Sequence, residues 1–170
     1  MRKSDSLIFE ISKTQLVVIF VYYFLMLLIG GVLLITTLCE LSEDMIKKQI
    51  IIKTVISSLS ASGMLCSLQY IKRLYKACIT NRIVQNSTFA GSIGNLVYFI
   101  SRPFFAFAFV VIMIYALLSG MFGVTGCLDY IINEKFLYLC VILSSFIGYS
   151  VGRVLDKFEN ISKEQIIKSE

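Results

Sequence analysis

Four long runs of apolar residues constrain this chain more than any other feature of its sequence. A helix needs about 20 apolar residues to cross roughly 30 Å of hydrocarbon, and each run is close to that length. Hydrophobic residues make up 57% of the 170 residues and the mean hydropathy is +0.81, above the usual composition of soluble domains. The excess is expected to face lipid, in spans over residues 15–38, 49–71, 103–122 and 136–154.

The spans predict an all-α fold, an integral membrane protein with four transmembrane helices in one membrane domain over residues 1–170. Residues 87–101 are moderately apolar and are expected to form a helix along or below the inner interface. Pro103 then opens span three, because proline is tolerated in the first turn of a helix. Residues 155–170 form a charged tail that we expect to continue helix four into the cytoplasm. Apolar residues recur at helical spacing around its start, namely Val151, Leu155, Phe158 and Ile161.

The lysine and arginine residues lie mainly between the apolar runs, where they orient a membrane protein. Cytoplasmic segments carry an excess of Lys and Arg. Twelve of the sixteen lie before span one, between spans two and three, or at and beyond the end of span four. This bias predicts that both termini face the cytoplasm. The four basic residues on the outer side are Lys47, Lys48, Lys53 and Lys135.

The residue types needed for common catalytic and metal sites are missing or scattered. The chain has no histidine, which removes imidazole as a general base or a zinc ligand. Its five cysteines show no C-x-x-C spacing. No charged residue lies near the middle of a predicted span, where ion-coupled transporters place theirs. We therefore expect no enzyme activity, no cofactor and no metal.

Cys39 and Cys127 flank the two loops that are expected outside. Either they form a bridge between those loops or they remain free thiols at helix ends, and the sequence alone does not give connectivity. Free thiols are the interpretation we favour.

Span two is rich in small and hydroxyl-bearing residues, whereas span one is mostly bulky. Small residues let helix backbones approach closely in a membrane, so span two is expected to pack against protein and span one to face mainly lipid. The hydroxyl face of span two has two interpretations. It lines a narrow aqueous path in an oligomer, or, as we favour, it packs while bonding carbonyls of its own helix. The residues concerned are Ser57, Ser60, Gly63 and Ser67.

Span four repeats a small residue at every fourth position, at Ser144, Gly148 and Gly152. This spacing predicts a close helix crossing. The helix on the other side belongs either to the same chain or to a neighbouring copy.

Basic residues gather on the side expected to be cytoplasmic, and no acidic residue interrupts the run from Lys72 to Arg82. Such cations either anchor helix ends to lipid headgroups or bind the acidic surface of a soluble protein partner. Direct nucleic-acid binding is not expected, because membrane topology already explains these charges. The candidate partner-binding residues are Lys72, Arg73, Lys76, Arg82, Arg102 and Arg153.

Several short motifs resemble those of small multi-pass proteins from bacterial defence islands. They are Gly91-Ser-Ile-Gly94, Tyr98-Phe-Ile-Ser-Arg-Pro103, Leu118-Ser-Gly120 and Phe146-Ile-Gly-Tyr-Ser-Val-Gly-Arg-Val-Leu-Asp156. Over residues 60–158 the chain is similar to the membrane subunits of Kiwa anti-phage systems. The resemblance implies a four-helix subunit that self-assembles in the bacterial inner membrane, holds a soluble DNA-binding partner on its cytoplasmic side and responds to phage attack.

The function expected from these features is that of a non-enzymatic, oligomeric sensor or scaffold. It would recruit a cytoplasmic effector, and the resemblance implies that it does so in anti-phage defence. The alternative is a pore- or channel-forming effector that depolarises or permeabilises the cell.

Overall fold

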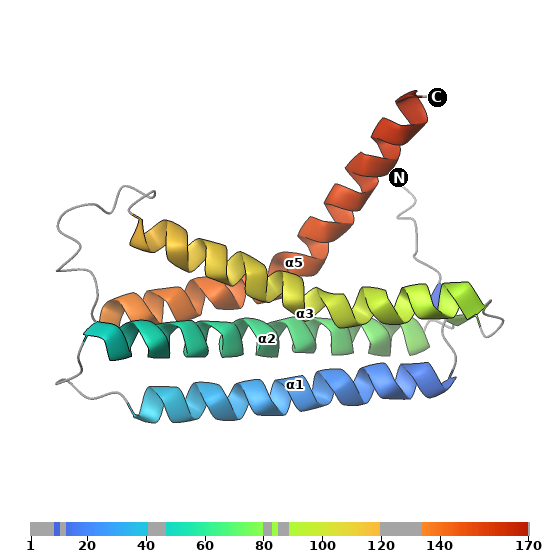
Figure 1. The fold of residues 1–170 in the computed structure, drawn as a ribbon. Helices are drawn as coiled ribbons and strands as arrows, with labels where there is room; N and C mark the ends of the chain where they lie inside the picture. Colours follow the sequence, from blue (N-terminus) through green and yellow to red (C-terminus); the bar gives the residue numbers. More distant parts are fainter. Residues whose placement is uncertain are drawn as a thin grey trace.

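The computed structural model describes residues 9–10, 13–40, 47–79, 83–84, 89–119 and 134–169. These residues form four long helices and one pair of two-residue strands (Figure 1). The helices are α1 (Lys13–Cys39), α2 (Lys47–Ile79), α3 (Phe89–Leu118) and α5 (Glu134–Ser169). Each contains a segment long and apolar enough to cross a membrane, which confirms the prediction of four such helices. The segments are Thr14–Cys39, Lys47–Lys76, Leu96–Leu118 and Glu134–Leu155.

Helix α2 is the central element of the bundle and packs against α1, α3 and α5. Half of its membrane-span segment is buried inside the protein, compared with 17% for α1. The bulky residues of α1, such as Phe20, Leu28 and Ile35, point outward and are exposed. The expected contrast between a protein-facing second helix and an outward-facing first helix is therefore confirmed.

Helix α5 approaches α2 closely at Gly148, which lies against the backbone of Ser62. A Cβ atom at position 148 would overlap the carbonyl oxygen of Ser62 and lie 2.8 Å from its Cα. One turn earlier Ser144 is fully buried and donates a hydrogen bond to the Cys140 carbonyl. The helix that meets Gly148 is thus α2 of the same chain. Only a residue without a side chain fits at this contact.

Two short strands place separate segments at one end of the bundle. Strand β1 (Phe9–Glu10) pairs in parallel with β2 (Ile83–Val84), Phe9 opposite Ile83. Residues 9–10, before α1, and residues 83–84, between α2 and α3, therefore lie side by side, as expected if both face the same compartment.

The structure differs from the sequence-based prediction at Pro103. A separate helix over residues 87–101 and a new span beginning at Pro103 were expected, yet α3 runs unbroken from Phe89 to Leu118 with Pro103 inside it. Helix α5 does continue as predicted, to Ser169, beyond the apolar segment that ends at Leu155. In Figure 1 this extension turns away from the other helices.

Replacing Gly148 by alanine should destabilise the protein by about 2–3 kcal/mol, because the new methyl group forces α5 away from the α2 backbone. The measurement is the thermal unfolding midpoint of the purified protein in mild detergent. Gly94→Ala is the matched control, since a Cβ there meets nothing within 4 Å, and it should be neutral or stabilising by roughly 0.5–1 kcal/mol. Equal effects of the two variants would contradict the close contact.

Candidate functional site

Basic residues from three helices meet where α2 ends. We call this region the basic end and define it by Lys72, Arg73, Lys76, Arg102 and Arg153. A Cβ built on Gly152 would lie 3.4 Å from Cζ of Arg73, so Arg153 of α5 is adjacent to the last turns of α2. The structure therefore brings these candidates together, while Arg82 lies outside the described residues.

The cations of the basic end differ in exposure. Lys72, Lys76 and Arg153 are exposed and Arg73 is half-buried, whereas Arg102 is only 4% exposed. Arg102 was expected at the inner end of span three, on the surface that binds a partner. Because α3 begins well before Pro103, Arg102 instead lies within the helix and inside the bundle. It does not belong to the surface that a partner can reach.

Each arginine of the basic end lies over a tyrosine of its own helix. Cζ of Arg102 is 3.9 Å from the centroid of the Tyr98 ring. The corresponding distances are 5.5 Å for Arg73 over Tyr70 and 5.6 Å for Arg153 over Tyr149. A guanidinium over an aromatic ring gains up to about 2 kcal/mol when the pair is desolvated, so the ring of Tyr98 helps to stabilise the buried Arg102. The tyrosines stand three or four positions before their arginines, a spacing at which helical side chains are neighbours. This spacing is visible in the sequence, and the three pairs could have been predicted from it.

The unbroken course of α3 depends on a hydrogen bond from α1. Proline has no backbone N–H, so Pro103 cannot donate to the carbonyl of Phe99 four residues earlier. The hydroxyl of Tyr23 donates to that carbonyl instead, at 2.5 Å. A neighbouring helix thus supplies the donor that Pro103 lacks, the usual condition for proline inside a membrane helix.

The Tyr23 ring extends this contact into an aromatic cluster that joins three helices. It stacks on Tyr70 of α2 with ring centroids 5.3 Å apart and an interplanar angle of 8°. Tyr70 meets the edge of Phe99 of α3 at 6.0 Å. Tyr23, Tyr70 and Phe99 are all at most 1% exposed, and edge-to-face and offset pairs of this kind each add about 0.5–1.5 kcal/mol beyond burial. The cluster fixes the positions of α1, α2 and α3 at the basic end.

The hydroxyl face of α2 bonds to its own helix. Ser57 donates to the Lys53 carbonyl at 2.7 Å, Ser60 to Ile56 at 2.8 Å and Ser67 to Gly63 at 2.8 Å. All three serines are buried. This is the arrangement that the packing interpretation of these residues describes.

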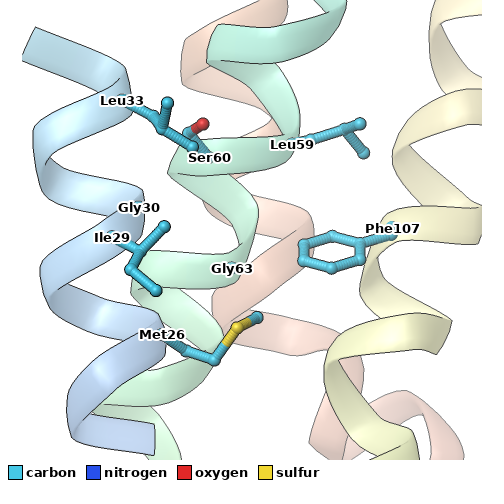
Figure 2. A pocket seen from close by; sticks show the side chains of 8 residues that line it. All are labelled: Met26, Ile29, Gly30, Leu33, Leu59, Ser60, Gly63 and Phe107. Carbon is cyan, nitrogen blue, oxygen red and sulfur yellow. The ribbon is translucent and has the colours of Figure 1, made fainter. Parts of the chain in front are cut away.

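Gly63 gives the α2 face room for an aromatic ring. Figure 2 shows the Phe107 ring of α3 directed at Gly63, with Met26 of α1 on the other side. A Cβ on Gly63 would lie 3.0 Å from the ring. The pocket beside it, with Ser60 on its wall, has a volume of about 220 Å³ and is otherwise lined by apolar side chains.

A different cation stabilises the opposite end of the bundle. Lys53 of α2 donates to the Glu40 carbonyl at 2.7 Å, and its Nζ lies 3.5 Å from the Glu40 carboxylate. The last carbonyls of a helix lack partners and carry partial negative charge, so Lys53 caps the end of α1. Cys39 is exposed nearby, while Cys127, its suggested disulfide partner, lies outside the described residues.

Comparison of the chain with family models, with curated proteins and with solved structures found no match. Among the described residues, no three His, Cys, Asp or Glu side chains come close enough together to hold a metal ion.

Removing the Tyr23 hydroxyl, by Tyr23→Phe, should destabilise the protein by about 1–2 kcal/mol, because the buried Phe99 carbonyl is left without a donor. Thermal unfolding in detergent measures the loss. Tyr22→Phe removes a hydroxyl from the next position, which is only half-buried, and should change the midpoint little. A Tyr23→Phe protein as stable as the Tyr22→Phe protein would show that the bond is not needed.

Proposed function

We propose that this protein is a non-enzymatic membrane scaffold that recruits a soluble cytoplasmic effector through the basic end. The observation that carries the proposal is the exposure of Lys72, Lys76 and Arg153 together at one end of a packed helical bundle. Exposed charges of one sign steer association with an oppositely charged partner. An acidic protein surface is the partner that fits them.

The orientation of this end toward the cytoplasm is part of the proposal. It is supported by the three-to-one excess of Lys and Arg on this side of the predicted spans. The strand pair adds support, since it places the segments before α1 and after α2 together.

The buried contacts give the proposed docking surface a fixed shape. Arg73 lies over Tyr70 and beside Gly152, while Tyr70 stacks on Tyr23. Partner-binding cations on α2 and α5 are thereby held by a core that joins the helices. Helix α5 also continues past its apolar segment, to Ser169, and so gives a soluble partner a second element to contact.

The alternative function, a pore, has less support in the geometry. Its candidate lining residues, Ser57 and Ser60, are buried and donate to carbonyls of α2. A channel lining needs polar groups that face the permeating ion, and these hydroxyls face their own backbone. The small residues considered for an oligomer interface, Gly148 above all, are likewise engaged within one chain.

The resemblance to Kiwa membrane subunits supplies the biological setting of the proposal. It points to anti-phage defence in a bacterial inner membrane, to self-assembly of the subunit and to a DNA-binding effector as the partner. Detection of phage at the envelope would then be passed to the effector through the basic end.

The double variant Lys72→Gln/Lys76→Gln should reduce co-purification of the partner from the native host at least several-fold. Recovery with the unchanged protein should also fall as salt is raised above 0.1 M, where charges are already screened beyond about 10 Å. Arg73 is left in place because it packs on Tyr70.

Lys47→Gln/Lys48→Gln is the control, since it removes the same charge from exposed positions at the other end of α2. It should leave recovery unchanged. Equal losses in both double variants would overturn the docking surface. The pore would replace the scaffold if liposomes containing this protein alone showed an ion flux, if Ser57→Ala and Ser60→Ala altered that flux, and if no soluble partner co-purified.

A further inference from the structure

A groove beside the basic end has a hydrocarbon-like lining, with the polar residues Gln69 and Lys72 among the residues that form it. Its floor is α2, which contributes Leu65, Leu68, Gln69 and Lys72, and its walls include Phe20 of α1 and Tyr149 of α5. We call it the α1–α5 groove. Its volume is about 590 Å³ and almost all of its lining surface is apolar. The groove opens outward between the helices, toward the surface that the proposed bilayer covers.

Gln69 is a buried polar residue in this groove whose amide oxygen has no partner. The side chain is 6% exposed, and Oε1 accepts no hydrogen bond from the described part of the chain. Buried polar atoms are nearly always satisfied in folded proteins, so an exception indicates a missing ligand or water. Lys72, Tyr75 and Tyr149 line the groove and carry donors, but none of them bonds to Oε1. Since Oε1 is itself covered, the amide must turn toward the groove to accept a hydrogen bond from a molecule there.

Two cations stand where the headgroup of such a molecule would lie. Lys72 lines the groove one turn beyond Gln69 and is exposed. Arg153 is exposed and lies over Tyr149, a wall residue, with Cζ 5.6 Å from the ring centroid. A phosphate between them would be bound by charge-assisted hydrogen bonds.

We propose that the α1–α5 groove binds an anionic phospholipid whose headgroup carries a hydroxyl, as that of phosphatidylglycerol does. An acyl chain lies along Phe20, Leu65 and Leu68, and Lys72 and Arg153 bind the phosphate. The hydroxyl donates to Oε1 of Gln69. The ligand thus meets each feature of the groove: the apolar wall, the positive charge and the unsatisfied acceptor.

Other apolar grooves of the bundle show that these features are not general. A groove between α3 and α5, lined by residues such as Ile112, Met113 and Val154, has a volume of about 390 Å³ and no basic residue in its lining. The pocket of Figure 2 also lacks one. Both are suited to the hydrocarbon of any lipid, and neither has a group that would select an anionic headgroup.

The test uses the full-length protein, purified in mild detergent, washed free of lipid and titrated with phosphatidylglycerol, phosphatidylcholine or inorganic phosphate. A ligand that binds the folded state raises the unfolding temperature. Phosphatidylglycerol should raise the midpoint by several degrees, whereas phosphatidylcholine and phosphate should not. An equal shift with phosphatidylcholine would overturn the headgroup selectivity, and a shift with phosphate alone would indicate a free-anion site instead.

Three variants locate the effect within the groove. Leu68→Trp fills the floor, Lys72→Gln removes the cation and Gln69→Leu removes the acceptor. Each variant should raise the phosphatidylglycerol concentration that gives half of the maximal shift in unfolding temperature. The increase should be about tenfold for Leu68→Trp and Lys72→Gln. Their controls are Ile112→Trp in the α3–α5 groove, and Lys48→Gln and Gln49→Leu at the far end of α2. These should respond like the unchanged protein. Variants and controls that respond alike would overturn the site.

This inference goes beyond the proposed function and fails separately from it. Lys72 belongs to both surfaces, but Leu68→Trp changes no charge and should leave partner co-purification intact. Loss of lipid selectivity with retained partner binding is therefore the expected behaviour of Leu68→Trp. Loss of partner binding in that variant would show that the two surfaces are one.

Discussion

The hydrogen bond from Tyr23 to the carbonyl of Phe99 is the interaction on which the basic end depends. Pro103 removes the backbone donor that a helix would place there, and a buried carbonyl without a partner is costly in a membrane protein. With Tyr23 as the donor, at 2.5 Å, α3 passes Pro103 without ending. The same contact brings α1 to α3 and encloses the Tyr70 ring between them. Arg102, next to the proline, is then carried into the bundle rather than left at its mouth.

Close packing along α2 connects this local contact to α5 and so to the rest of the bundle. The backbone of Ser62 touches Gly148, and the Tyr70 hydroxyl lies 2.7 Å from where a Cβ of Gly152 would be. Helix α5 is thereby held against the helix that carries Lys72 and Lys76. The outer faces of α1, α3 and α5 remain apolar and exposed, as a lipid-facing surface requires. The proposed docking surface and the proposed lipid groove both rest on this division between a rigid polar end and an apolar surround.

The sequence predicted the helices well because their signal is local. Length and hydropathy marked four spans, and the small residues of α2 correctly indicated that it is the buried helix. The boundary at Pro103 was wrong, because the donor that makes an internal proline tolerable lies on another helix, far away in the sequence, at Tyr23. The burial of Arg102 was missed for the same reason, since its place inside the bundle depends on where α3 begins. Gln69 gave no signal in the sequence, and only the groove around it shows that its amide oxygen lacks a donor.

The Tyr23 hydroxyl replaces the hydrogen bond that Pro103 removes, and the unbroken course of α3 depends on that replacement. A double-mutant cycle tests it directly, with Tyr23→Phe introduced into the unchanged protein and into Pro103→Ala, and with unfolding free energies measured in detergent. Alanine restores the backbone N–H that can donate to the Phe99 carbonyl. If Tyr23 is the substitute donor, Tyr23→Phe costs less than half as much free energy of unfolding in the Pro103→Ala protein as in the unchanged one. The same cost in both proteins would show that Tyr23 does not replace the lost bond.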